Sequence, residues 1–196
     1  DDPFGGGVPE TDFPAADPET TGQVMKFRVG ARASRDTSRD PARLTLPAFK
    51  PLKKQADNTR QVSLNEEAST FPGFDGPVAA LLGTLDGAGN GVPKGWADPI
   101  TENPALNSIE IWEIYNFTED AHPIHIHEVQ FQVVDRQEFD DRRRRPPEDW
   151  ETGFKDTVIA YPEEITRVKA LFDNPGLFVW HCHIVEHEDH EMMRPY

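Results

Sequence analysis

The chain has 196 residues, with 18 prolines, 14 glycines and a formal net charge of −15. It is long enough to bury a sizeable core, and its composition suits a loop-rich β protein better than a helical bundle. The negative charge argues against nucleic acid and anionic membrane surfaces as partners. No stretch is apolar and long enough to span a membrane, and the single cysteine, Cys182, leaves no intrachain disulfide. The first residues lack the features of a signal peptide, so the location of the protein stays open.

Residues 1–43 are predicted to form a tail and connector. Residues 1–22 are rich in Pro, Gly and acidic side chains without a hydrophobic period, and residues 30–43 are charged and polar. Between them, Val24–Val29 alternates weakly and predicts one strand. Because a single strand needs a sheet to pair with, we interpret it as the last strand of a preceding domain that is otherwise absent.

Residues 44–196 are predicted to form one β domain, because short β-prone runs alternate there with turn signals. Val78–Leu85 predicts a strand, and Asp86–Gly91 predicts the turn that follows it. Ile109–Phe117 is dense in β-branched and aromatic residues on both faces, which indicates a central strand.

The second half of this domain continues the pattern. Three runs predict strands, and one run predicts a short helical turn. The strands are Val129–Val133 and Thr166–Phe172, each with one buried face, and Leu177–Cys182 as the last strand; the helical turn is Ile184–Met193. The sequence therefore predicts an all-β sandwich or barrel.

Two short segments hold all seven histidines and the only cysteine, and six of these histidines are candidate ligands. The first is His122-Pro-Ile-His125-Ile-His127, and the second begins with His-Cys-His at residues 181–183 and continues to Met193. Two imidazoles and a thiolate in a plane, with a long bond to a Met thioether, form a blue copper site. The ligand types therefore favour copper.

Strand geometry predicts that the second motif serves two metal sites. Successive side chains of an extended backbone point to opposite faces, so Cys182 faces one way while His181 and His183 face the other. Metals on the two faces would be linked through very few backbone bonds. A simple electron carrier has no use for that link.

The first motif repeats this arrangement. His125 and His127 share one face of an extended segment, and His122 falls on the other face, where it can join Cys182. His187 and Met192, five and ten residues after Cys182, are predicted to complete this site. Met193 competes with Met192 for the axial position, and only spacing separates them.

These residues resemble the multicopper oxidase family, specifically its last cupredoxin domain. The motifs His-Pro-x-His-x-His and His-Cys-His-x-x-x-His-x-x-x-x-Met are both complete. Four wider stretches resemble the bacterial spore-coat laccases and their relatives, the bilirubin oxidases and phenoxazinone synthases: Thr21–Val29, Asp36–Arg39, Trp96–Glu102 and Glu186–Pro195. The resemblance covers nearly the whole chain after roughly the first twenty residues, and it implies a cupredoxin-like Greek-key β-sandwich with an extended N-terminal tail.

The resemblance also implies a role for each ligand. The type 1 copper would be held by His122, Cys182, His187 and Met192, the type 2 copper by His125, and the type 3 pair by His127, His181 and His183. Single electrons from phenols, aminophenols, bilirubin-like pigments or metal ions would enter at the type 1 copper. They would pass through Cys182 to the trinuclear cluster of type 2 and type 3 coppers, which reduces dioxygen to water. Glu188 would help to deliver protons to that cluster.

The chain departs from the family in its histidine count. The family's trinuclear cluster needs four His-x-His pairs, and this sequence has two. We therefore expect a C-terminal fragment or one piece of a split enzyme, inactive alone. Its partner would be the N-terminal cupredoxin domains of the same enzyme, or it would self-associate.

Two alternatives stay open: a stand-alone blue-copper electron carrier, and a metal-free relative or fragment that keeps only the fold. The charge run Asp140–Asp149 is interpreted as a solvated loop, with a role in substrate access left open. Trp96 and Asp98 are interpreted as turn and packing residues. No motif claims His190, which we expect in solvent or beside the ligands.

Overall fold

The computed structural model describes residues 17, 19–20, 23, 25–31, 34–45, 47–52, 55–73 and 77–196. The chain divides into two units, Gly5–Phe49 and a larger unit that contains Lys50–Tyr196. Among the described residues of the smaller unit, the regular structure is η1 (Pro41–Arg43), where the Asp40 carboxylate accepts a hydrogen bond from the Ala42 amide.

The described part of the strand predicted at Val24–Val29 is not a strand in this structure. Val24 lies outside the described residues, and 25–29 have no regular structure. The side chains of Met25, Phe27 and Val29 are 72 to 98% exposed. A lone segment without a neighbouring strand has nothing to satisfy its backbone donors and acceptors, which agrees with the absence of a strand at residues 25–29. The assignment of the segment to a preceding domain stays a prediction.

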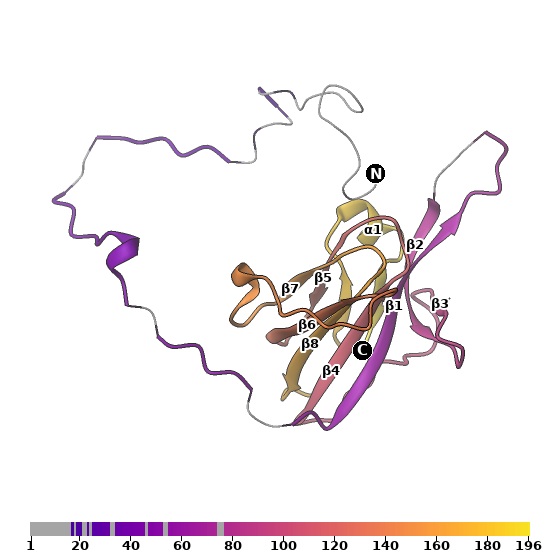
Figure 1. Cartoon of the computed structure of the whole chain (residues 1–196). Coiled ribbons are helices and arrows are strands. Elements are labelled where there is room, and N and C mark those ends of the chain that lie inside the picture. The colour runs from indigo at the N-terminus through magenta and orange to yellow at the C-terminus, as the bar shows by residue number, and fades with distance from the viewer. Residues whose placement is uncertain are drawn as a thin grey trace. The chain divides into compact units, whose positions relative to one another are not determined.

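The larger unit is an all-β sandwich of two sheets, as predicted (Figure 1). The six-stranded sheet has the order β3-β2-β1-β4-β8-β6, and the four-stranded sheet has the order β10-β9-β5-β7. The strands of the larger sheet are β1 (Asn58–Ala68), β2 (Pro77–Leu85), β3 (Gly91–Pro93), β4 (Ser108–Asn116), β6 (Phe131–Glu138) and β8 (Glu164–Phe172). Those of the smaller sheet are β5 (His122–Ile126), β7 (Thr157–Ala160), β9 (Val179–Cys182) and β10 (Met193–Pro195). A short helix, α1 (Val185–Asp189), follows β9, and a 3-10 turn, η2 (Asp149–Glu151), precedes β7.

Strand β4 is central, as its apolar character on both faces predicted. It pairs in parallel with β1 and antiparallel with β8. The turn predicted at Asp86–Gly91 joins β2 to β3, and the Asp86 carboxylate accepts hydrogen bonds from the amides of Ala88 and Asn90. Strand β1 was not singled out in the sequence, because polar residues interrupt its apolar pattern at both ends.

The predicted one-sided burial of β6 and β8 was partly wrong. Gln132 and Arg167, expected on the polar faces, are buried. The Arg167 guanidinium forms ion pairs with Glu113 at 2.6 Å and Asp135 at 2.8 Å. Because these carboxylates neutralise its charge, the long side chain of Arg167 can be buried on the sheet. The apolar pattern of the sequence does not reveal this burial.

The predicted last strand, Leu177–Cys182, is shorter and is not the last. It forms β9 from Val179, and β10 follows it after α1. Met193–Pro195 pairs antiparallel with β9, and this return of the chain was not anticipated. The helical turn predicted within Ile184–Met193 is confirmed as α1.

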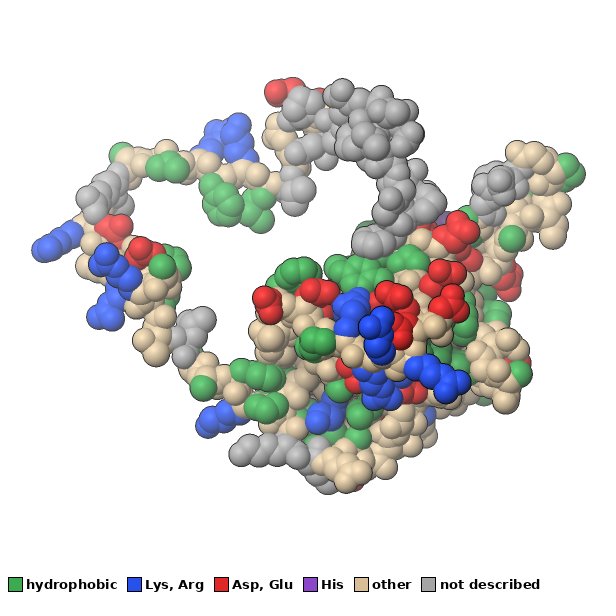
Figure 2. Space-filling model, in the orientation of Figure 1, with side chains coloured by type: hydrophobic (Ala, Val, Ile, Leu, Met, Phe, Trp, Pro, Cys, Tyr) green, Lys and Arg blue, Asp and Glu red, His purple; other side chains and the backbone are tan. Residues whose placement is uncertain are grey.

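The core lies between the two sheets and is organised around Trp112. Its ring stacks on Phe172 at 5.7 Å and meets Trp180 and Tyr196 edge-on at 5.6 and 5.7 Å, which are favourable aromatic geometries. Trp180 precedes the His-Cys-His segment, so this packing fixes the orientation of β9. On the face of the molecule seen in Figure 2, acidic and basic side chains are interspersed. The described residues contain no helix long and apolar enough to cross a membrane.

Candidate metal centre

Four side chains that were predicted to share one site lie on the core side of the four-stranded sheet. This inner group consists of His122, Cys182, His187 and Met192. All four are buried, and Met192 and Cys182 have no exposed surface. The Cys182 sulfur is 3.7 Å from His122 Nδ1 and 3.8 Å from His187 Nδ1, and the two nitrogens are 3.2 Å apart.

The triangle formed by Cys182 Sγ, His122 Nδ1 and His187 Nδ1 has the dimensions of a metal site. The point equidistant from the three atoms lies about 2.1 Å from each, close to metal–imidazole bonds of roughly 2.0–2.1 Å and metal–thiolate bonds of about 2.3 Å. One thiolate and two imidazoles in a plane are the donor set of a blue copper site. The residues present therefore fit copper.

The chain around α1 brings His187 and Met192 to this site. His187 is the buried residue of α1, and Glu191, with φ of 71°, turns the chain back from the helix. Met193 pairs with His181, so Met192 lies opposite Cys182, whose amide donates to the Met192 carbonyl at 3.0 Å. Opposite residues of an antiparallel pair point to the same face, which favours Met192 over Met193 as the residue beside Cys182.

A hydrogen-bonded chain fixes the ring of His122. The Thr118 hydroxyl donates to Asn116 Oδ1 at 2.8 Å and lies 2.6 Å from His122 Nε2. With the single hydroxyl proton directed to Asn116 Oδ1 or to the Asp120 carbonyl at 3.1 Å, His122 Nε2 is the donor in its contact with Thr118. The lone pair of Nδ1 then points toward Cys182, the arrangement that a metal ligand needs.

Burial shifts the pKa values of the inner group. It raises the pKa of the Cys182 thiol to about 11, and it lowers the pKa of His122 to about 3, with the neighbouring His187 adding to the second effect. At neutral pH the imidazole of His122 is therefore ready to bind a metal, whereas the thiol must lose a proton.

The remaining predicted ligands lie on the opposite face of the same strands. This outer group consists of His125, His127, His181 and His183. The ligand nitrogens of His125, His127 and His181 lie within 4.8 Å of one another. The ring of His183 is 5.3 Å from that of His181 and 5.8 Å from that of His125. His127 and His183 are exposed, so this group opens to the surface of the unit.

Backbone carbonyls orient two of these rings. His125 Nδ1 donates to the Asp156 carbonyl at 2.7 Å, and His181 Nδ1 donates to the Cys182 carbonyl at 2.9 Å. In each ring Nε2 is left with the lone pair that binds a metal. The Nε2 atoms of His181 and His127 are 3.1 Å apart, and burial together with the neighbouring histidines lowers the pKa of His127.

The inner and outer groups meet at Cys182. Its side chain belongs to the inner group, and its carbonyl accepts the hydrogen bond from His181 of the outer group. Glu188, predicted to handle protons, lies on the outer side, with its carboxylate 3.3 Å from His181 Nδ1.

The sequence profile of the multicopper oxidase family matches residues 74–196, which contain all of these ligands. The chain belongs to the multicopper oxidase family. Two laccases are similar to it: that of Bacillus subtilis is 39% identical over 193 residues and that of Bacillus stratosphericus 38% identical over 195 residues. Each alignment covers 91% of this chain and 35% of the relative. The chain therefore spans about a third of the length of these relatives.

Solved structures of the family share the fold. The multicopper oxidase McoA from Aquifex aeolicus matches with a TM-score of 0.56 and 27% identity, over 77% of this chain and 31% of that one. A laccase from Pediococcus acidilactici matches with a TM-score of 0.54 and 27% identity, over 84% of this chain and 31% of that one. These matches confirm the cupredoxin-like architecture.

Other predicted residues lie away from both groups. His190 is exposed, and its Nδ1 donates to the Glu186 carbonyl at 2.9 Å. Asp98 closes a turn by accepting from the Gly95 amide at 3.0 Å. No residue of the charge run Asp140–Asp149 is buried, as expected of a solvated loop, and Arg143, Arg144 and Arg145 each form an ion pair there.

Sequence reasoning missed several residues that support the family's ligands. Thr118 and Asn116, which orient His122, form an Asn-x-Thr sequence shortly before the first motif, a signal that is weak by itself. Arg194, fully buried, donates to the carbonyls of Gly95 and Pro99 at 2.5 and 2.8 Å and lies 3.5 Å from Glu102. It ties the Trp96–Glu102 stretch to the strand that begins beside Met192. Only the fold brings these residues together.

Proposed function

We propose that this chain is the copper-binding C-terminal domain of a laccase-like oxidase. In this proposal, single electrons from phenols, aminophenols or similar reductants enter at the inner group and leave toward the outer group. At the outer group, in a site completed by histidines of another domain, these electrons would reduce dioxygen to water. The observation that carries the proposal is the position of the two groups on opposite faces of β9, joined at Cys182.

The inner group would hold the type 1 copper. Copper bound there would supply one-electron redox chemistry. His122 and His187 would each provide an Nδ1 lone pair, Cys182 its thiolate, and Met192 a thioether. The burial of all four side chains excludes water and leaves the shape of the site to the protein.

Cys182 would conduct the electron out of this site. From its sulfur the path runs along the side chain and the peptide to the carbonyl oxygen, and then through the 2.9 Å hydrogen bond to His181. A second path runs along the backbone to His183. Both histidines would bind the type 3 copper pair, and His127 would join them.

The outer group would be half of a trinuclear site. His125 would bind the type 2 copper, and the lone pairs of His125 and His181 are already directed outward by their bonds to carbonyls. The missing half would come from N-terminal cupredoxin domains or from a second copy of this chain. Glu188, beside His181, would hold and release the protons that dioxygen reduction consumes.

Copper reconstitution tests this proposal. We expect the purified chain to bind copper at the inner group and to develop the intense visible absorption of a blue copper site, without consuming dioxygen in the presence of a phenol. Addition of N-terminal cupredoxin domains carrying two further His-x-His pairs should restore oxygen consumption. Colour without any oxidase activity in the combined sample would favour the stand-alone electron carrier, and the absence of colour would refute the proposal.

A further inference from the structure

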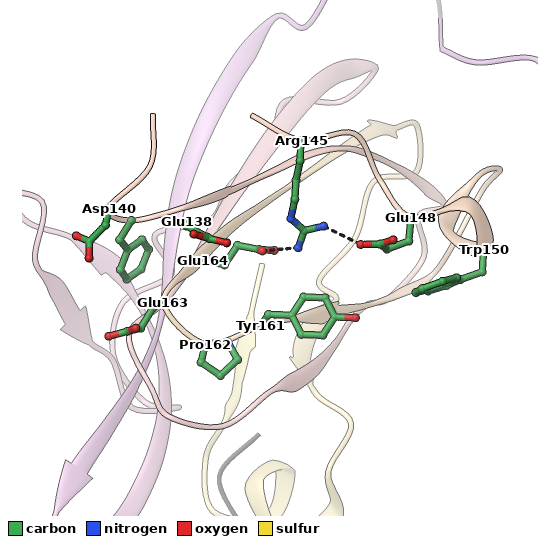
Figure 3. Close-up of a pocket in the computed structure, with 10 residues that line it drawn as sticks. Glu138, Asp140, Arg145, Glu148, Trp150, Tyr161, Pro162, Glu163 and Glu164 are labelled. Carbon is green, nitrogen blue, oxygen red and sulfur yellow. Dashed lines mark hydrogen bonds and ion pairs between the residues drawn. The ribbon is translucent and has the colours of Figure 1, made fainter. Parts of the chain in front are cut away.

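A cavity of about 620 Å³ lies beside the loop that follows β6, outside both ligand groups. This volume is typical of sites for small organic molecules. Its walls combine three aromatic rings with five carboxylates and one arginine: Phe139, Trp150, Tyr161, Glu138, Asp140, Glu148, Glu163, Glu164 and Arg145, with Pro162. Figure 3 shows Glu138, Asp140 and Glu163 toward one end, Trp150 at the other end, and Tyr161 between them.

The charge of the cavity is negative, because its arginine is already neutralised. Arg145 donates to Glu148 at 2.8 Å and to Glu164 at 2.5 Å (Figure 3). Glu138, Asp140 and Glu163 form no ion pair among the described residues, and all three are exposed. Arg143 interacts with Glu138 from outside the cavity, but its guanidinium is paired with Asp141 at 2.8 Å, so a positively charged group at this end would still meet an excess of carboxylates.

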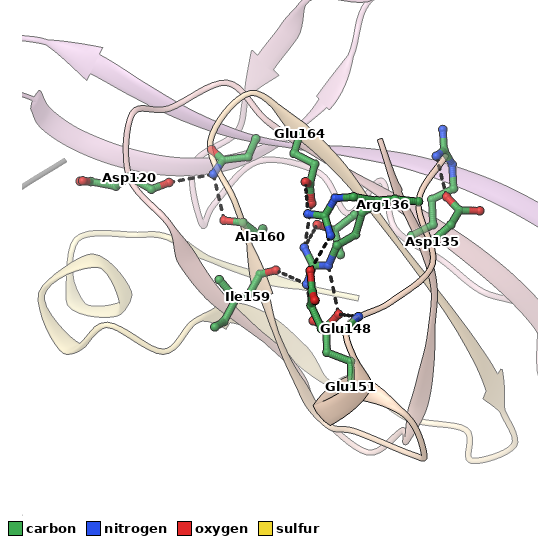
Figure 4. Close-up of polar contacts among 12 residues, drawn as sticks. Asp120, Asp135, Arg136, Glu148, Glu151, Ile159, Ala160 and Glu164 are labelled. Carbon is green, nitrogen blue, oxygen red and sulfur yellow. Dashed lines mark hydrogen bonds and ion pairs between the residues drawn. The ribbon is translucent and has the colours of Figure 1, made fainter. Parts of the chain in front are cut away.

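Buried ion pairs fix the backbone at the end of the cavity that carries Trp150. Arg136, whose side chain is completely buried, bonds to both Glu151 and Glu164 (Figure 4). Glu151 is the neighbour of Trp150 in η2, and it also accepts a hydrogen bond from the Glu148 amide at 2.9 Å. Trp150 is nevertheless 68% exposed. The backbone that carries this exposed ring is thus fixed, which leaves only the side-chain rotamer to be ordered when a ligand binds.

The wall of the cavity is connected to the inner group. Tyr161 follows Ala160, which is opposite His122 in the β5–β7 pair. The Ala160 carbonyl accepts from Asn116 Nδ2 at 3.1 Å (Figure 4), and Asn116 Oδ1 accepts from Thr118, the partner of His122. The path from the cavity to His122, a ligand of the proposed type 1 copper, therefore runs through the peptide bond between Tyr161 and Ala160 and then through three hydrogen bonds.

We propose that this cavity binds cationic aromatic amines, and that it is a docking site for reductants of this class. The ammonium group lies at the end formed by Glu138, Asp140 and Glu163, and the attached ring packs on Tyr161 and Trp150. The electron then enters through the Ala160–Asn116–Thr118 connection to His122. The redox part of this proposal rests on the proposed function, whereas the binding part does not.

Binding is tested first on the copper-free chain by isothermal titration calorimetry with phenyltrimethylammonium. We expect one site, and about tenfold weaker binding of the uncharged tert-butylbenzene, since three carboxylates act on the cation. The variant E138Q/D140N/E163Q should weaken binding of the cation about tenfold, and Trp150→Ala about fivefold, the range of a lost aromatic pair. The control E67Q/E128Q/D173N removes the same charge from exposed positions elsewhere and should change binding less than twofold.

Electron transfer is tested next on the copper-loaded chain, by stopped-flow bleaching of the blue absorption. We compare two p-phenylenediamines, one with a trimethylammonium side arm and one with a sulfonate side arm. The cationic reductant should react about tenfold faster, and E138Q/D140N/E163Q should remove this advantage.

Three results would overturn the inference: no binding of phenyltrimethylammonium, equal losses in the cavity and control variants, or a cationic advantage that the cavity variant keeps. A chain that binds the cation but never turns blue would instead refute the proposed function. Circular dichroism of each variant verifies that it is folded.

Discussion

The inner and outer ligand groups are built from the same two short motifs, yet the protein completes one and leaves the other open. The inner group is buried between the sheets, and three of its donor atoms already surround a point about 2 Å from each. The outer group includes two exposed histidines. A site within a core needs only its own domain, whereas a site on a sheet face can be completed by another one.

The difference follows from strand geometry. Neighbouring residues of β9 point to opposite faces, so Cys182 and His181 cannot share a site although they are adjacent. The core packing of Trp180 decides which of them faces inward. One residue pair thereby connects the buried inner group, where we propose a redox centre, to an exposed surface where we propose that a partner binds.

The largest effect is expected from Cys182→Ser. The inner group then loses the thiolate that gives a blue copper site its colour, so the visible absorption of the copper-loaded chain should vanish completely. The outer histidines keep their positions and should still bind copper weakly. Absorption spectroscopy and a copper count measure both effects, and an unchanged blue band would contradict the assignment of the inner group.

The pH dependence of copper uptake should distinguish the groups. Burial raises the pKa of the Cys182 thiol to about 11, so copper must displace a proton at any lower pH, and affinity rises as pH rises. Burial lowers the pKa of His122 to about 3, so this ring adds no proton competition near neutrality. The affinity of the inner group should therefore increase about tenfold per unit between about pH 7 and 9, above the ordinary range of histidine titration. Competition titrations measure the slope, which the outer group of Cys182→Ser should lack.

Hydrogen bonds that orient the ligand rings should affect copper affinity more in the inner group than in the outer group. Thr118→Val removes the acceptor of His122 Nε2 and should weaken copper binding about 10- to 100-fold. Thr157→Val removes a 3.2 Å contact to His125, but the Asp156 carbonyl still orients that ring, so we expect less than about a threefold change. Copper affinities of the two variants, measured with the same chelator, give the comparison; similar losses would show that burial is not the deciding factor.

The smallest predicted change concerns the axial ligand. Met192→Leu removes a weak donor and should raise the reduction potential by about 60 mV or more, which corresponds to a tenfold change in equilibrium constant. The chain should remain blue. Met193→Leu, the matched control, should leave the potential unchanged because this residue lies opposite His181. Spectroelectrochemistry measures both potentials, and the reverse outcome would move the axial role to Met193.

Much of the fold and the site follows from local sequence. The apolar run of β4, the turn after Asp86 and the two histidine motifs depend on neighbouring residues, and alternation along an extended chain places Cys182 opposite His181. The rest depends on contacts between distant segments. Gln132 and Arg167 look solvent-facing, and the burial of Arg167 requires carboxylates from β4 and β6. The Asn116–Thr118 support of His122 and the Arg136 network beside the cavity are likewise visible only once the strands are paired.

The most direct test is a crystal structure of the copper-loaded chain with anomalous diffraction measured at the copper edge. We predict a copper ion bonded to Cys182 Sγ, His122 Nδ1 and His187 Nδ1. Copper found only among the exposed histidines, with the sulfur of Cys182 unbound, would contradict the account.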